Sequence, residues 1–143
     1  MPKMIFLNLP VADLPRATAF YQTIGATKNE LFCDGTASCM VFSETIHVML
    51  LTHDKFRQFT PKPISDAKTS NQMLICISAA SKTEVDDVVT RAGAAGGNVD
   101  PSPIDDYGWM YGRSFEDPDG HMWGVNWMDL DAAKAARFET AKA

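Results

Sequence analysis

The chain repeats one pattern of predicted elements, and this repeat constrains the fold most strongly. Asp13 and Ser81 are good N-cap residues, and each follows a strand-like run. Gly25 and Gly93, which are predicted to end the helices, lie at the same distance after these two N-caps. Three strand-like runs come after each predicted helix. The pattern predicts an α+β fold of two βαβββ modules. Because neither module can cover both faces of its sheet, we expect a cupped mixed β-sheet with the helices outside.

The predicted elements divide one domain of residues 1–143 into four parts. Module one covers residues 4–52, a linker covers 53–70, module two covers 71–128, and a helical tail covers 129–143. The strand-like runs are residues 4–11, 27–33, 38–42, 46–52, 72–78 and 109–116, with one more after a turn at 117–120. The linker contains Pro61 and Pro63, which break the pattern, and an amphipathic turn around Phe56 and Phe59. It is either a plain tether or a lid over a ligand.

Composition excludes several classes of partner. The formal net charge of −5 argues against nucleic acid, which requires a dense basic patch. No apolar run approaches the ~20 residues of a membrane span, and the N-terminus lacks signal-peptide architecture, so we expect a cytoplasmic protein. Cys33, Cys39 and Cys76 lie in apolar runs without a short paired motif, which predicts free buried thiols.

A tight turn organises the second half of the chain. Asp117-Pro118-Asp119-Gly120 suits a β-turn, because proline presets φ, glycine suits the last position, and the Asp117 carboxylate can bond backbone amides. Apolar and aromatic residues flank the turn on both sides. This arrangement is typical of a β-hairpin.

Two motifs carry a resemblance to a known family. The first is the stretch from Val11 to Gly25, VADLPRATAFYQTIG, and the second runs from Gly112 to Trp123, GRSFEDPDGHMW. Together they resemble the vicinal oxygen chelate superfamily, which includes glyoxalase I, extradiol dioxygenases and the fosfomycin- and bleomycin-resistance proteins. The resemblance covers about Met4 to Trp127. It implies the cupped fold and a homodimer, and it does not imply one particular reaction.

The resemblance also implies where a metal would be bound. Metal-dependent members place His, Gln or Glu on four strands of the cup, and the matching positions here are Phe6, Leu50, Gln72 and Gly124. Only Gln72 offers a donor atom, whereas a divalent site normally needs three or four. His47, His53 and His121 are scattered, and we interpret them as surface or structural residues. We therefore expect no metal and no other cofactor.

The inner face is predicted to form a ligand pocket. If Phe6 and Gln72 face inward, every second residue of their strands does so too. The resulting inner surface is apolar with a few neutral amides, as is usual for a small-molecule pocket. Arg113 either grips an anionic ligand group or pairs with Asp117 or Glu116, and Tyr111 either walls the pocket or lies in the core. The predicted pocket residues are Phe6, Asn8, Leu50, Gln72, Tyr111, Arg113, Gly124 and Asn126.

Two main functional hypotheses follow from these patterns. The first is a homodimer that binds a small organic molecule without a metal, as the drug-sequestering resistance proteins do. The second is an enzyme, either a lyase similar to lactoylglutathione lyase or a dioxygenase, which would require the metal. A third interpretation, a scaffold protein, predicts a cup filled by its own side chains. No catalytic residue, nucleic-acid partner or membrane partner is predicted.

Overall fold

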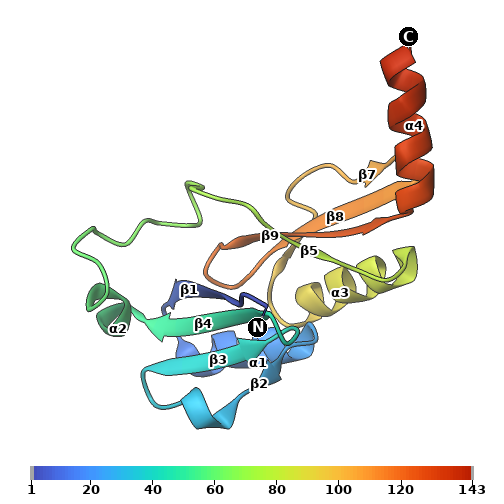
Figure 1. Cartoon of the computed structure of the whole chain (residues 1–143). Helices are drawn as coiled ribbons and strands as arrows, with labels where there is room; N and C mark the ends of the chain where they lie inside the picture. Colours follow the sequence, from blue (N-terminus) through green and yellow to red (C-terminus); the bar gives the residue numbers. More distant parts are fainter. Residues whose placement is uncertain (1, 143) are drawn as a thin grey trace.

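The computed structural model contains the two predicted modules (Figure 1). It describes the backbone of residues 2–142 and the side chains up to residue 136. Module one consists of β1 (Ile5–Val11), α1 (Leu14–Thr23), β2 (Thr27–Lys28), the 3-10 helix η1 (Glu30–Phe32), β3 (Ala37–Val41) and β4 (Ile46–Thr52). The linker begins with α2 (His53–Arg57). Module two consists of β5 (Ile75–Ser78), α3 (Lys82–Ala94), β6 (Asn98–Val99), β7 (Asp105–Asp106), β8 (Met110–Glu116) and β9 (Met122–Met128), and α4 (Leu130–Lys142) follows.

The two modules form two separate mixed sheets with matching strand order. The first sheet has the order β1-β4-β3-β2, and the second has the order β5-β9-β8-β6, with β7 also paired to β8. In each sheet the first strand pairs in parallel with the last strand of its module. β1 and β5 are therefore edge strands, and no ladder joins them within the described residues. The predicted mixed cup is thus built from two sheets that are not hydrogen-bonded to each other.

The predicted helix caps are present at both repeats. The Asp13 carboxylate accepts a hydrogen bond from the Arg16 amide at 3.1 Å, and Ser81 Oγ accepts one from the Glu84 amide at 3.1 Å. The Glu84 carboxylate reaches back to the Ala80 amide, which completes a capping box. Gly25 follows α1 with a φ of +118°. The prediction for Gly93 is wrong, because it lies inside α3.

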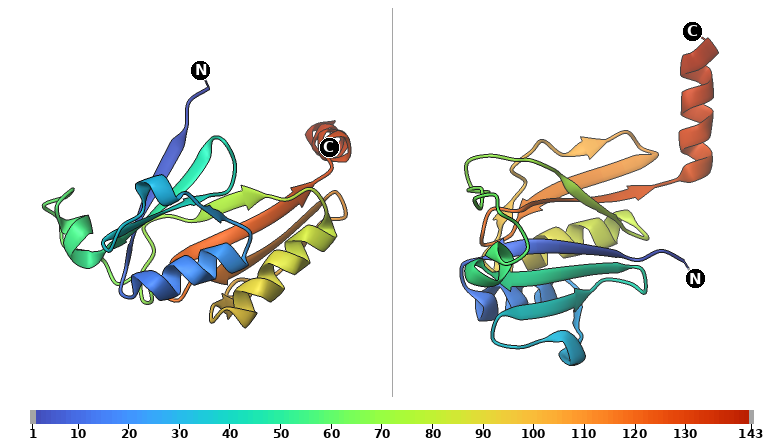
Figure 2. Two further views of the ribbon diagram at one scale, coloured as in Figure 1. Left: turned by 90° about the horizontal axis from the view of Figure 1, so that it is seen from below. Right: turned by 60° about the vertical axis from the view of Figure 1, so that its left-hand side comes forward.

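One buried core extends across both modules. α1 and α3 lie side by side on the same side of the strands, as the left view of Figure 2 shows. Phe20 of α1 lies 6.0 Å from Phe115 of β8, and Tyr21 lies 5.8 Å from Trp123 of β9, measured between ring centroids. All four side chains are almost completely buried. The aromatic contacts therefore pack α1 of module one against the second sheet.

Two predicted strands are shorter in the structure, and the predicted helical tail is present as α4. The strand predicted for 27–33 ends after two residues, because the Asn29 side chain accepts a hydrogen bond from the Leu31 amide and starts η1. The strand predicted from residue 72 begins at Ile75. α4 projects away from both sheets (Figures 1 and 2). No helix in the described part of the chain is long and apolar enough to span a membrane.

The cysteines match their predicted state only in part. All three are free, but only Cys39 is buried, while Cys33 is partly buried and Cys76 is exposed. Cys76 lies on β5 opposite Gly124 of β9, on the face of the second sheet that no helix covers. The prediction of buried thiols is therefore wrong for Cys76.

Candidate functional site

The turn at residues 117–120 is the point where the two modules are joined. The Asp117 amide donates to the His121 carbonyl at 3.0 Å, and the Gly120 amide donates to the Asp117 carbonyl at 3.0 Å. The Asp117 Oδ1 atom accepts hydrogen bonds from the Asp119 amide at 3.0 Å and the His121 amide at 2.8 Å. The predicted hairpin and the predicted role of its first aspartate are thus confirmed.

The second oxygen of Asp117 binds the core of the other module. Tyr21 Oη donates to Asp117 Oδ2 at 2.6 Å, and Trp123 Nε1 donates to Tyr21 Oη at 3.0 Å. Asp117 is only 3% exposed, and this burial raises the pKa of its carboxyl, against the opposing effects of His121 and the Tyr21 hydroxyl. Burial, and then the adjacent Asp117 charge, raises the pKa of Tyr21 well above its usual value.

Two further contacts hold the end of β1 against this turn. Asp119 Oδ1 accepts a hydrogen bond from the Ala12 amide at 2.8 Å. His121 Nε2 lies 2.8 Å from the Pro10 carbonyl oxygen, and because a carbonyl only accepts, Nε2 carries the proton. These contacts bring the free edge of β1 close to the beginning of β9. They therefore set the spacing between the two edge strands.

The linker crosses directly over the same turn. Gly120 has a φ of +94°, and a Cβ at this position would lie 2.7 Å from the backbone nitrogen of Lys68. Only glycine combines this φ with so close a backbone approach. The turn therefore positions the linker as well as β1.

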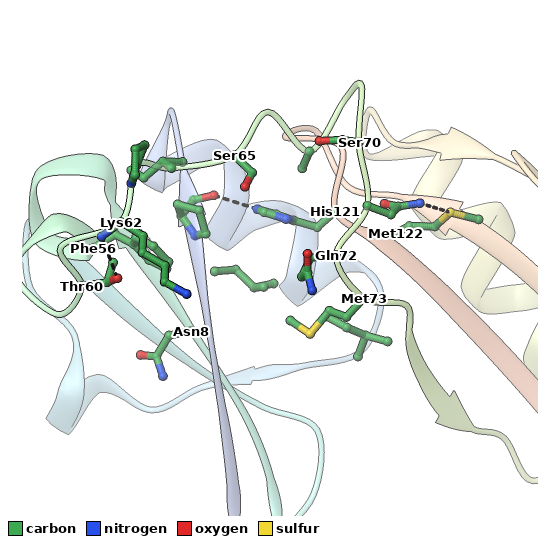
Figure 3. A pocket seen from close by; sticks show the side chains of 17 residues that line it. Asn8, Phe56, Thr60, Lys62, Ser65, Ser70, Gln72, Met73, His121 and Met122 are labelled. Carbon is green, nitrogen blue, oxygen red and sulfur yellow. Dashed lines mark hydrogen bonds between the residues drawn. The ribbon is translucent and has the colours of Figure 1, made fainter.

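The linker and the edge of β1 enclose a cavity of about 320 Å³, here called the linker cavity (Figure 3). Its lining is mostly apolar, with a few amides, hydroxyls and one lysine, which is the usual composition of a small-molecule site. The residues that line it are Asn8, Leu9, Pro10, Phe56, Thr60, Lys62, Pro63, Ile64, Ser65, Ala67, Ser70, Asn71, Gln72, Met73, Ile75, His121 and Met122.

Only two of the eight predicted pocket residues line the linker cavity, namely Asn8 and Gln72. Arg113, Gly124 and Asn126 line a second cavity of about 200 Å³ on the second sheet. Most of the linker-cavity residues lie between residues 60 and 73. The sequence analysis placed residues 60–70 in the linker and assigned only Gln72 of this stretch to the pocket.

The prediction for Leu50 is wrong, because the strand register puts it on the helix-covered face. β1 and β4 pair in parallel with Leu9 opposite Leu50 and Phe6 opposite His47. Leu50 is fully buried in the core, whereas the rings of Phe6 and His47 stack on the other face at 4.6 Å. Assigning Leu50 and Phe6 to one face was a register error of one residue.

Tyr111 and Arg113 also lie on the helix-covered face of their sheet. Arg113 donates to Asp100 through Nε at 3.0 Å and through an Nη at 2.6 Å, and its other Nη donates to Asp86 of α3 at 2.9 Å. Tyr111 Oη donates to the same Asp86 oxygen at 2.7 Å. Arg113 thus has the structural role that was considered, but its partners are not the predicted Asp117 or Glu116.

The contacts of Asp86 predict a dependence of stability on pH. The hydrogen bond from Tyr111, and then that from Arg113, lowers the pKa of Asp86 below its usual value. Its contribution to the free energy of unfolding is therefore present above about pH 4 and is lost as the pH falls through the lower folded pKa. We expect the urea midpoints of the wild type and Asp86→Asn to differ at neutral pH, and we expect this difference to shrink as the pH is lowered below about 4. A difference that does not change with pH would contradict this assignment.

The donor atoms of the inner face do not fit the divalent metal that the family resemblance implies. His47 does face the Phe6 side, and its Nδ1 is buried without a hydrogen-bond partner, the one such side-chain atom in the described chain. However, no group of three His, Cys, Asp or Glu side chains among the described residues is arranged so that it could hold a metal ion. One imidazole and the Gln72 amide supply fewer donors than a divalent ion normally requires.

A comparison with protein families identifies one match. The model described as "Glyoxalase/Bleomycin resistance protein/Dioxygenase superfamily" matches residues 3–125. The match includes module one, the linker, and module two as far as residue 125, with the turn at residues 117–120. No curated protein matches the sequence.

Solved structures show the same fold. A hypothetical protein from S. aureus has a TM-score of 0.73 and 25% identity, with 89% of this chain and 94% of that chain covered. A glyoxalase/bleomycin resistance protein/dioxygenase family enzyme from Burkholderia phytofirmans PsJN has a TM-score of 0.72 and 20% identity, with 90% and 100% covered. The fosfomycin resistance protein FosX from Listeria monocytogenes has a TM-score of 0.64 and 19% identity, with 90% and 93% covered.

Proposed function

Because the chain belongs to the glyoxalase/bleomycin resistance protein/dioxygenase superfamily, we propose that it binds a small organic molecule in the linker cavity without a divalent metal. The observation that carries this proposal is the cavity of about 320 Å³ between the β1 edge and the linker. Its volume lies at the lower end of the ~300–1,000 Å³ usual for ligand sites. The ligand is therefore small.

The polar groups of the cavity support a ligand-binding pocket rather than a cup that is filled by the protein's own side chains. The amides of Asn8 and Gln72 and the hydroxyl of Ser65 lie in its lining, among apolar side chains such as Ile64 and Met73. Apolar contacts would supply affinity, and a few oriented polar groups would supply specificity. A scaffold protein would have no need to keep polar groups around a hollow of this size.

The alternative, a metal-dependent lyase or dioxygenase, is the less supported candidate. Its chemistry would need several donor atoms near one point of the inner face, and with the observed register the strand positions there hold Phe6, Met49 and Gly124 besides Gln72. We also propose that the protein is a cytoplasmic homodimer. Phe6, Met73 and Leu74 are about half exposed or more and would supply apolar surface for a second copy.

A binding screen with a cavity-filling variant tests the proposal. We expect small aromatic and aliphatic compounds to raise the melting temperature of the wild-type protein. Ala67→Phe should abolish this shift, because Ala67 lines the cavity and a phenyl ring would occupy it. Ala19→Phe, at an exposed position of α1, is the matched control and should keep the shift.

Metal analysis of protein purified without chelators distinguishes the two functions. We expect substoichiometric metal in the wild type and the same content in Gln72→Ala. One tightly held Ni, Zn, Fe or Mn per chain, reduced by Gln72→Ala, would overturn the metal-independent proposal. A screen in which no compound shifts the wild type, or in which Ala67→Phe keeps every shift, would count against binding in the linker cavity.

A further inference from the structure

The linker cavity has an unusual charge for this chain. The sequence contains 18 acidic and 13 basic residues, so most of its charged side chains are carboxylates. None of the residues that line the linker cavity is acidic, and its one Lys or Arg residue is Lys62. The cavity is therefore a locally cationic site in an anionic protein.

Lys62 is an exposed residue whose side chain extends toward the cavity. It lies between Pro61 and Pro63, whose rings restrict the backbone on both sides, and its amide donates to Thr60 Oγ1 at 3.1 Å. Figure 3 shows its side chain extending from the linker into the hollow, on the side opposite Gln72.

The charge of Lys62 has no acidic partner among the described residues. The ion pairs found there use Lys28, Arg57, Lys82 and Arg113. Within the same described residues, the side chains of Ser65 and Gln72, which also line the cavity, form no hydrogen bond with the protein. One cation and two uncommitted polar groups therefore face a mostly apolar space.

We propose that the ligand of the linker cavity is a monoanionic carboxylic acid with an apolar body of about one ring, and that Lys62 binds its carboxylate. One lysine matches one negative charge, and no second cation among the described lining residues would neutralise a dianion such as a phosphate monoester. Ser65 and Gln72 can donate to the second carboxylate oxygen. The inference rests on the proposed function, because it specifies the class of molecule bound at that site.

Matched acids and amides test this proposal by calorimetric titration. The probes are benzoate, phenylacetate and hexanoate, each compared with its neutral amide, on wild type, Lys62→Gln and Lys134→Gln. Lys134 lies on α4, outside the cavity, and its replacement makes the same change in net charge. We expect each acid to bind wild type and Lys134→Gln at least about tenfold more tightly than its amide. Lys62→Gln should remove this preference, so that each acid binds this variant no more tightly than its amide.

The possible results separate the two proposals. Equal affinity for acids and amides in the wild type, or an acid preference that Lys62→Gln keeps, would overturn the carboxylate assignment and leave the binding function standing. Failure of all acids and all amides to bind would overturn both. An acid preference that also falls in Lys134→Gln would show a general charge effect and would overturn the role of Lys62.

Discussion

Replacing Asp117 by alanine is expected to lower the free energy of unfolding by about 3 kcal/mol, because three buried or partly buried donors lose their acceptor. These donors are the Tyr21 hydroxyl and the amides of Asp119 and His121. The loss of this carboxylate also weakens the position of Trp123, because Trp123 Nε1 donates a hydrogen bond to Tyr21 Oη. Urea denaturation followed by tryptophan fluorescence measures the change.

Two variants control for this prediction. Asp117→Asn keeps one carbonyl oxygen for the two amides and should lose less stability than the alanine variant. Asp105→Ala, which removes an exposed carboxylate from β7, should change stability by less than about 0.5 kcal/mol. Equal stability of Asp117→Ala and Asp105→Ala would show that the hydrogen bonds of the turn do not hold the modules together.

Replacing Gly120 by alanine is expected to lower stability by about 2 kcal/mol or more and to weaken ligand binding as well. The φ of +94° is strained for alanine, at a cost of about 1–3 kcal/mol. The added Cβ would also meet the Lys68 backbone and push the linker away from the turn. Since the linker forms a wall of the cavity, affinity for any cavity ligand should fall together with stability.

Alanine substitutions at two other glycines separate the backbone strain of a positive φ from the clash of the new Cβ with the linker. Gly25→Ala has a comparable φ of +118° but no heavy atom within 4 Å of the new Cβ, so it should lose stability without losing ligand affinity. Gly35→Ala has neither constraint and should change neither property. If Gly120→Ala kept full ligand affinity in the folded state, the contact between the turn and the linker would not shape the cavity.

The repeat in the sequence predicted the fold well because its signals are local. An aspartate or serine cap, an apolar helix stripe and a turn with proline and glycine each act within a few residues, as Asp13, Ser81 and the turn at 117–120 show. The error at Gly93 has a similar local cause. Three glycines occur at 93, 96 and 97, and the sequence does not indicate which one takes the positive φ that the structure gives to Gly96.

The candidate site was harder to predict because it depends on register and on long-range packing. Period-2 alternation fixes relative faces within a strand, but the pairing of β1 with β4 decides which face of β4 joins Phe6. Arg113 was assigned neighbours close in sequence, whereas its partners Asp86 and Asp100 come from α3 and the segment that follows it. The linker wall depends on the contact between Lys68 and Gly120, for which a single sequence carries no signal.

The position of the linker cavity connects small-molecule binding with the cohesion of the whole chain. Its walls come from β1 of the first sheet and from β5 and β9 of the second sheet. In the described residues, no backbone hydrogen bonds of a strand ladder join these two sheets. A bound ligand would contact both sheets and would stabilise their packing against each other. At a free concentration about 100-fold above its dissociation constant, it would add about 2.7 kcal/mol to the free energy of unfolding.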